Sequence, residues 1–164
     1  MASRGRDLGR PEKGNLDRRP PQRLQAVGRS GEAFVHYETA LDIKPYLAEA
    51  QSNWGNALQA VRRPKEALKH YAEATRIEPE YAVAHYNWGI ALHALGRTER
   101  AIARFQEAIR LQPDFADPHN NLGVVYESQA RFDDALNHLR QSVKLEPDNK
   151  TFRSNLNRVE KLIQ

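Results

Sequence analysis

The sequence repeats itself with a period of 34 residues, as the prolines Pro45, Pro79, Pro113 and Pro147 mark. Five further columns of alanine, glycine, aromatic or aliphatic residues share this frame. Their members are Ala33, Ala67, Ala101 and Ala135; Ala40, Ala74 and Ala108, with Ser142; Gly55, Gly89 and Gly123; Tyr37, Tyr71 and Phe105, with Leu139; and Ile43, Ile77, Leu111 and Leu145. Six columns in one frame indicate a stack of repeated structural units, each burying its apolar face against the next.

The columns resemble the signature of the tetratricopeptide-repeat (TPR) family: a large residue, Leu-Gly, a large residue, Ala, an aromatic residue, Ala and Pro. The three copies read Trp54-Gly55…Leu58…Ala67…Tyr71…Ala74…Pro79, Trp88-Gly89…Leu92…Ala101…Phe105…Ala108…Pro113, and Leu122-Gly123…Tyr126…Ala135…Leu139…Ser142…Pro147. The resemblance covers about residues 30–164. It implies an all-α solenoid of antiparallel helix pairs, wound into a right-handed superhelix.

The repeats predict where the helices begin and end. We expect first helices near 48–61, 82–95 and 116–129, and second helices near 64–78, 98–111 and 132–145. Each second helix should end at its proline, which cannot donate the helical hydrogen bond. Gly96 suits a left-handed turn between paired helices. Arg62 and Ala130 hold the same place in the other repeats, where that conformation costs about 1 kcal/mol or less.

The chain therefore divides into four parts. Residues 1–29 are basic and rich in Pro, Gly and Arg, and we expect this segment to be disordered. Residues 30–47 hold the second helix of a truncated repeat, and residues 48–149 hold three complete repeats, over 48–81, 82–115 and 116–149. Residues 150–164 should form a capping helix near 149–163. Its outer side is kept polar by Arg153, Arg158, Glu160 and Lys161.

The formal charge of +4 belongs to the N-terminal segment. Residues 1–31 carry eight Arg and Lys against three Asp and Glu, whereas residues 32–164 carry seventeen against eighteen. A nucleic-acid-binding domain normally has a basic face, so we expect no nucleic acid on the folded body. A role of the N-terminal segment toward nucleic acid or an acidic partner stays open. No stretch is apolar enough for a membrane helix or a secretory signal, and we expect a cytoplasmic protein.

We expect neither catalysis nor a bound metal or cofactor. The chain has no cysteine, phosphate-binding glycine loop or nucleophile elbow. Its histidines recur with the repeat, which indicates packing or surface roles; they include His36, His70 and His138 in one column and His85 and His119 in another. Trp54 and Trp88 share a column with leucines and are predicted to be interior residues.

An asparagine column marks the candidate binding site. Asn53, Asn87, Asn121 and Asn155 recur at the sixth position of each first helix, although asparagine is a mediocre helix former. The TPR resemblance places this position on the concave groove, where a carboxamide can bond both polar groups of a passing peptide unit. The candidate peptide-binding residues are Asn53, Asn56, Tyr86, Asn87, Ile90, Asn121, Val124 and Asn155. The alternative is that the asparagines bond within their own solenoid.

The resemblance favours a protein–protein interaction module, a TPR adaptor or scaffold that binds an extended peptide or a partner helix in the groove. Two alternatives stay open. The asparagine column is similar to that of the TPR superhelix in O-linked N-acetylglucosamine transferases, so the chain could be a detached substrate-presenting arm. It could also be a structural solenoid that self-associates weakly through its ends.

The groove should not bind the free C-terminal carboxylate of chaperone-type peptides. TPR domains that bind such peptides share a carboxylate-binding set of two Asn and three basic residues, spread over three repeats. The matching positions here are Ser52, Asn56, Asn87, Asp117 and Asn121. The two Asn are present, the basic residues are missing, and Asp117 would repel a carboxylate.

Overall fold

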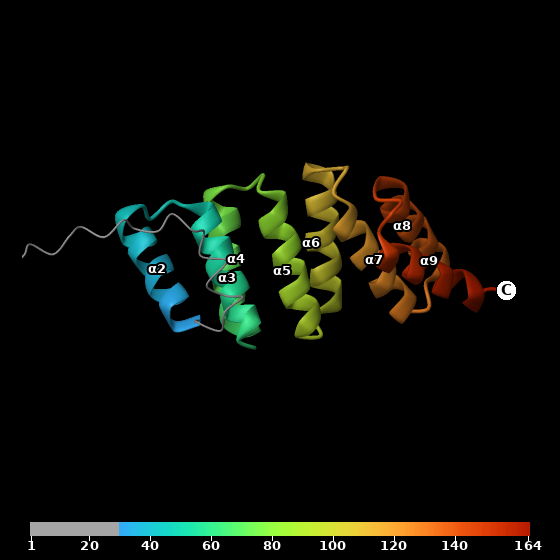
Figure 1. Ribbon diagram of the computed structural model, residues 1–164, viewed down its shortest axis with the longest axis horizontal. Helices are drawn as coiled ribbons and strands as arrows, with labels where there is room; N and C mark the ends of the chain where they lie inside the picture. Colours follow the sequence, from blue (N-terminus) through green and yellow to red (C-terminus); the bar gives the residue numbers. More distant parts are fainter. Residues whose placement is uncertain (1–29) are drawn as a thin grey trace, which may run out of the picture.

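A computed structural model describes residues 30–164, and within them the chain forms eight α-helices and no strand (Figure 1). The helices are α2 (Ser30–Ile43), α3 (Ala48–Ala60), α4 (Pro64–Ile77), α5 (Ala82–Ala94), α6 (Thr98–Leu111), α7 (Ala116–Ser128), α8 (Phe132–Leu145) and α9 (Lys150–Leu162). Every predicted helix end lies within one residue of the observed one. The expectation for residues 1–29 lies outside the described residues.

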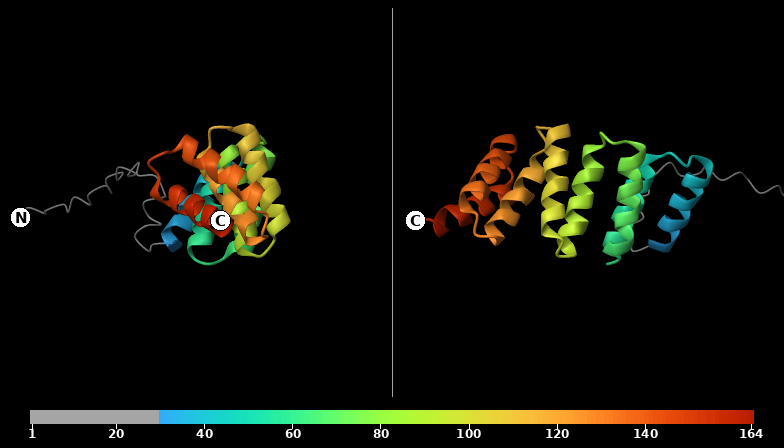
Figure 2. Two further views of the ribbon diagram at one scale, coloured as in Figure 1. Left: turned by 90° about the vertical axis from the view of Figure 1, so that its right-hand side faces the viewer. Right: turned by 180° about the vertical axis from the view of Figure 1, so that it is seen from behind.

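The helices stand in a row along the long axis of the molecule, from α2 at one end to α9 at the other (Figures 1 and 2). Helices α3 and α4, α5 and α6, and α7 and α8 form the three pairs, each of which packs on the next. Helix α3 also contacts α5, and α7 contacts α9, whereas no comparable contact joins α4 to α6 or α6 to α8. The first helices therefore line the closer-packed side. The prediction of an all-α helical-repeat solenoid is confirmed.

Each pair turns through a left-handed residue. After α5, Gly96 has φ +70°, the Gly96 amide donates to His93 O at 2.9 Å, and the Arg97 amide donates to Leu92 O at 2.9 Å. These two bonds form a Schellman motif, which satisfies carbonyls left over at a helix end. Arg62 and Ala130 take the same conformation, with φ of 60° and 56°, as the repeat predicts.

The glycine column makes room for the large residue of the paired helix. A Cβ on Gly89 would lie 2.5 Å from Cε1 of the Phe105 ring, and one on Gly55 would lie 2.6 Å from Cε1 of Tyr71. Phe105 and Tyr71 are fully buried. The glycines thus allow a side chain of the second helix to lie directly on the backbone of the first, which joins the two helices of each pair tightly.

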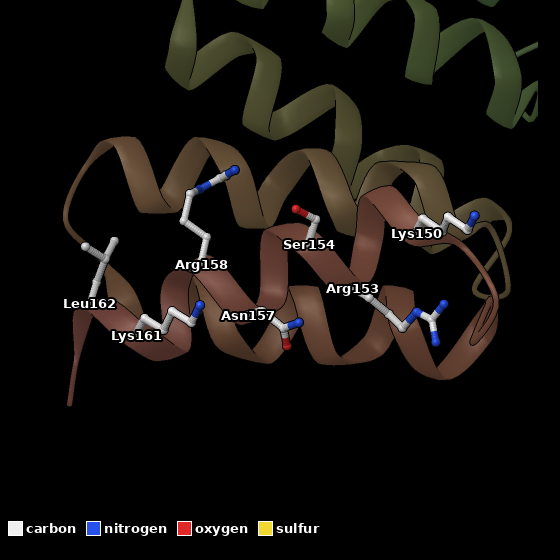
Figure 3. Close-up of a pocket in the computed structure, with 7 residues that line it drawn as sticks. All are labelled: Lys150, Arg153, Ser154, Asn157, Arg158, Lys161 and Leu162. Atoms are coloured by element: carbon white, nitrogen blue, oxygen red, sulfur yellow. The ribbon is translucent and has the colours of Figure 1, made fainter.

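Helix α9 closes one end of the row with a polar outer face. Phe152 and Val159 are buried against α8, whereas Lys150 and Arg153 lie exposed along α9 (Figure 3). Asn157 is exposed at the position that glycine holds in the other first helices, where no second helix packs on it. This face suits contact with water.

Candidate peptide-binding groove

The candidate groove runs across the first helices α3, α5, α7 and α9. Between α5 and α7 it holds a pocket of about 240 Å³. The lining residues are Ile90, His93, Phe105, Asn121, Val124 and Val125. Three of them, Ile90, Asn121 and Val124, are among the residues predicted from the sequence. The pocket combines apolar walls with two polar side chains, those of His93 and Asn121.

Two asparagines of the column hydrogen-bond to the neighbouring repeat. Asn121 Nδ2 donates to the Tyr86 hydroxyl at 3.3 Å, and Asn155 Nδ2 donates to Asn120 Oδ1 at 2.8 Å. Asn155 Oδ1 also accepts from Arg158, at 3.1 Å. Because Tyr86 and Asn120 lie on the preceding first helix, the bonds from Asn121 and Asn155 tie successive repeats together. Part of the column therefore has the internal bonds that the sequence left open as an alternative.

The other groove asparagines lie in different surroundings. Asn56 Oδ1 accepts from the Tyr71 hydroxyl at 2.7 Å, and Gln59 donates to the same hydroxyl at 2.6 Å. Asn53 is half-buried. Asn87 is half-buried as well, and its carboxamide makes no hydrogen bond to any residue within 30–164. Asn87 is thus the column member in the middle repeat whose polar atoms are open to an incoming chain.

Tyr86 is held firmly at the edge of the groove. Its ring lies 5.0 Å from the ring of Phe115 and 6.0 Å from that of Phe105, measured between centroids. Burial, with a smaller effect from the charge of Asp117, raises the pKa of Tyr86 to about 12. The phenol is therefore neutral at physiological pH. It serves as an acceptor for Asn121 and as an apolar wall.

The positions matching a carboxylate-binding set do not suit an anion. Ser52 is buried, and its Oγ has no hydrogen-bond partner among the described residues. Burial and the charge of Glu146 raise the pKa of Asp117. A position that already disfavours one negative charge disfavours a second beside it.

A second column of polar contacts was not predicted from the sequence. In the three helix pairs it joins the fourth residue of the first helix to the residue nineteen positions later. Gln51 Oε1 accepts from His70 Nδ1 at 2.8 Å, and His119 and His138 approach through their Nδ1 atoms at 3.0 Å. The sequence placed these histidines in register, but only the packing of the paired helices reveals which ones meet. Within residues 30–164, no group of three or more His, Asp or Glu could hold a metal ion.

The two tryptophans are only half-buried, so the prediction of interior residues is correct in part. Each packs against the core on one side and against a polar group of its paired helix on the other. Trp54 stacks on His70 at 4.4 Å between ring centroids, and Arg104 Cζ lies 3.9 Å from the centroid of the Trp88 ring. His70 and Arg104 are polar and keep contact with water, so the tryptophans that pack on them lie at the edge of the core.

Comparison with family models settles the class of the protein. The model of the TPR repeat matches residues 65–96 and 89–130, and that of the tetratricopeptide repeat matches 116–149. Together the matches span residues 65–149, more than half of the chain. The chain belongs to the tetratricopeptide-repeat family. It is a repeat module for protein interaction, the role that TPR repeats typically serve.

Solved TPR proteins share this fold at low sequence identity. MamA matches with a TM-score of 0.76 and 21% identity, over 86% of this chain and 82% of its own. A thermophilic TPR protein of Thermus thermophilus matches at 0.75 and 21%, over 86% and 78%. PilF of Pseudomonas aeruginosa matches at 0.81 and 24%, over 87% and 65%. These likenesses establish the fold.

No curated protein matches the TPR chain. Among the described residues, no helix is both long and apolar enough to cross a membrane.

Proposed function

We propose that the groove of this TPR protein binds an extended segment of a partner polypeptide. The observation that carries the proposal is the pocket between α5 and α7, which sets Ile90 and Val124 beside Asn121. An apolar side chain of the partner fits such a pocket. The neighbouring carboxamide can bond its backbone.

The spacing of the asparagines fits an extended chain. Packed helices lie about 8–10 Å apart, and an extended chain advances about 3.3 Å per residue. One asparagine can therefore meet about every third residue of the bound segment. Since these contacts are made to the backbone, the groove should tolerate different side chains at most positions.

The internal hydrogen bonds set the order of importance within the column. Asn121 must exchange its bond to Tyr86, 3.3 Å long, for one to the peptide, so its net gain is small. Asn87 gives up no hydrogen bond to another described residue. We therefore expect Asn87 to contribute more to binding than Asn121 or Asn155.

The test uses peptides selected on the protein from a phage-displayed library of random 12-residue sequences. Their affinities are measured by fluorescence anisotropy for the wild type, the N87A/N121A variant and the N137A variant. Asn137 is exposed on α8, away from the first helices, and provides the matched control.

The lost bond of Asn87, with a smaller contribution from Asn121, predicts an affinity roughly 3- to 20-fold weaker for N87A/N121A and unchanged for N137A. Circular dichroism verifies that each variant keeps its helices. Equal affinities for all three proteins, with the helices intact, would overturn the proposal and make the column purely structural.

A further inference from the structure

A second pocket lies on the side of the second helices, between α4 and α6. Its volume is about 430 Å³. The lining residues are Leu68, Trp88, Leu92, Arg97, Arg100, Ala103 and Arg104. It shares no residue with the groove pocket between α5 and α7. Its walls are apolar, and its polar groups are all arginines.

None of these three arginines forms a close ion pair with a carboxylate within residues 30–164, although the charge of Glu107 acts on Arg104. In the flanking repeats the arginine equivalent to Arg97 is neutralised on its own helix. Arg63 pairs with Glu66 at 2.5 Å, and Arg131 pairs with Asp134 at 2.6 Å. The acid of both pairs is replaced by Arg100 in the middle repeat, which puts two like charges where the other repeats have an ion pair.

A second replacement adds to this charge. Arg104 takes the position of His70 and His138, and burial lowers the pKa of both histidines so that they are neutral at physiological pH. The same three positions thus carry about +3 in the middle repeat and about zero in each flanking repeat. Because like charges three and four residues apart on a helix repel, this arrangement is less favourable than the flanking ion pairs, and a bound anion would relieve the repulsion.

The geometry holds one of these cations against an aromatic wall. Arg104 Cζ lies 3.9 Å from the centroid of the Trp88 ring, and its guanidinium is partly withdrawn from water. Burial lowers the pKa of Arg104, an effect that Glu107 opposes and Arg100 reinforces. Glu107 is itself paired with Arg110 at 2.7 Å. Arg104 Nη1 lies 3.5 Å from His85 Nδ1, and the remaining N–H groups of a guanidinium held over an indole can donate to a carboxylate.

We propose that this pocket binds an acidic segment of a partner polypeptide. A Glu or Asp side chain of that segment pairs with Arg97, Arg100 and Arg104, and an apolar neighbour lies against Leu68 and Trp88. The occupant is a polypeptide rather than a nucleic acid because residues 32–164 carry seventeen basic against eighteen acidic residues. A phosphate backbone needs a long basic track, and three clustered arginines supply only one anchor.

The decisive variant is R100E/R104H, which copies the first complete repeat at both positions. The glutamate at position 100 can pair with Arg97, as Glu66 pairs with Arg63. The histidine at position 104 can stack on Trp88, as His70 stacks on Trp54. It should fold at least as well as the wild type. The control is K150Q/R153E on the exposed face of α9, which removes the same three charges elsewhere (Figure 3).

The same displayed library is selected in parallel on the three proteins, and the winning acidic peptides are measured by anisotropy. We expect peptides with clustered Asp and Glu on the wild type and the control, and at least tenfold weaker binding to R100E/R104H. Replacing their Glu with Gln should weaken binding to the wild type equally.

Three results would overturn the proposal. The first is that selection on the wild type does not enrich peptides with Asp and Glu. The second is that K150Q/R153E loses as much affinity as R100E/R104H. The third is binding of a phosphoserine peptide or of oligouridine, but not of Glu-containing peptides, to the arginines. If N87A/N121A bound its peptides as tightly as the wild type, the groove proposal would fail but the arginine-pocket proposal would stand, because the two pockets share no residue.

Discussion

His119 Nδ1 and His138 Nδ1 lie 3.0 Å apart across the α7–α8 pair. A hydrogen bond between two imidazoles at this distance requires one ring to donate and the other to accept, so the accepting nitrogen must be unprotonated. Burial, together with the neighbouring His138, lowers the pKa of His119 to about 4. The pair therefore stabilises the fold only while it is neutral.

The TPR domain should lose stability as the pH falls from about 6.5 toward about 4. The unfolded chain binds a proton at His119 near pH 6.5, whereas the folded chain does so only near pH 4, so the unfolded state gains protons first. Because solvent reaches part of the site, we expect a loss of roughly 1–2 kcal/mol from this pair. Urea unfolding at pH 7 and pH 5 measures it.

The H119Q variant tests the origin of this loss, since Gln51 and His70 already form such a pair at 2.8 Å. H119Q should keep its stability at pH 7 and lose about 1 kcal/mol less than the wild type at pH 5. The same substitution at the exposed His36 is the control. An unaltered pH dependence in H119Q would show that other groups cause the loss.

Gly89→Ala should destabilise the protein by about 2 kcal/mol. The added methyl would lie 2.5 Å from the fully buried Phe105 ring, and overpacking outweighs the better helix propensity of alanine. Thermal or urea unfolding at pH 7 gives the difference. A variant as stable as the wild type would mean that the α5–α6 pair can separate to admit a methyl group.

Ala130→Gly should stabilise the protein by about 0.5–1 kcal/mol. Ala130 has φ 56°, a conformation that glycine adopts without strain. Gly96, one repeat earlier, has φ +70° and open space where its Cβ would be. Gly96→Ala should thus give a change of similar size and opposite sign. Two changes of the same sign would contradict this account of the turn.

An EEVD-type peptide with a free C-terminus should not bind at micromolar concentration. Asp117 is near the site, and its raised pKa reports an environment that disfavours negative charge. Isothermal titration with the free peptide and its amidated form is the measurement. Micromolar binding that amidation abolishes would refute the prediction.

The helices could be predicted because their signals are local. A proline after each second helix and a left-handed residue after each first helix fix the ends, whatever the packing does. Even Arg62, an unusual residue for such a turn, was placed correctly, because the period of the repeat outweighs its low propensity for that conformation.

The contacts inside the candidate site could not be predicted in this way. The bond from Asn121 to Tyr86 joins residues 35 positions apart, and its existence depends on how far one repeat is rotated against the next. The arginine pocket was missed for another reason. A departure from the repeat at Arg100 looks like ordinary surface variation until the structure places it beside Trp88 and Arg104.

The exposed asparagine at position 157 determines how this array could be lengthened by engineering. A 34-residue unit inserted at an internal junction, such as that between Phe115 and Ala116, would offer each neighbour the kind of surface it already contacts. A unit attached beyond α9 would bring its second helix onto a carboxamide where the other first helices have bare backbone. Growth at that edge therefore requires Asn157→Gly first, whereas growth from the middle requires no such change.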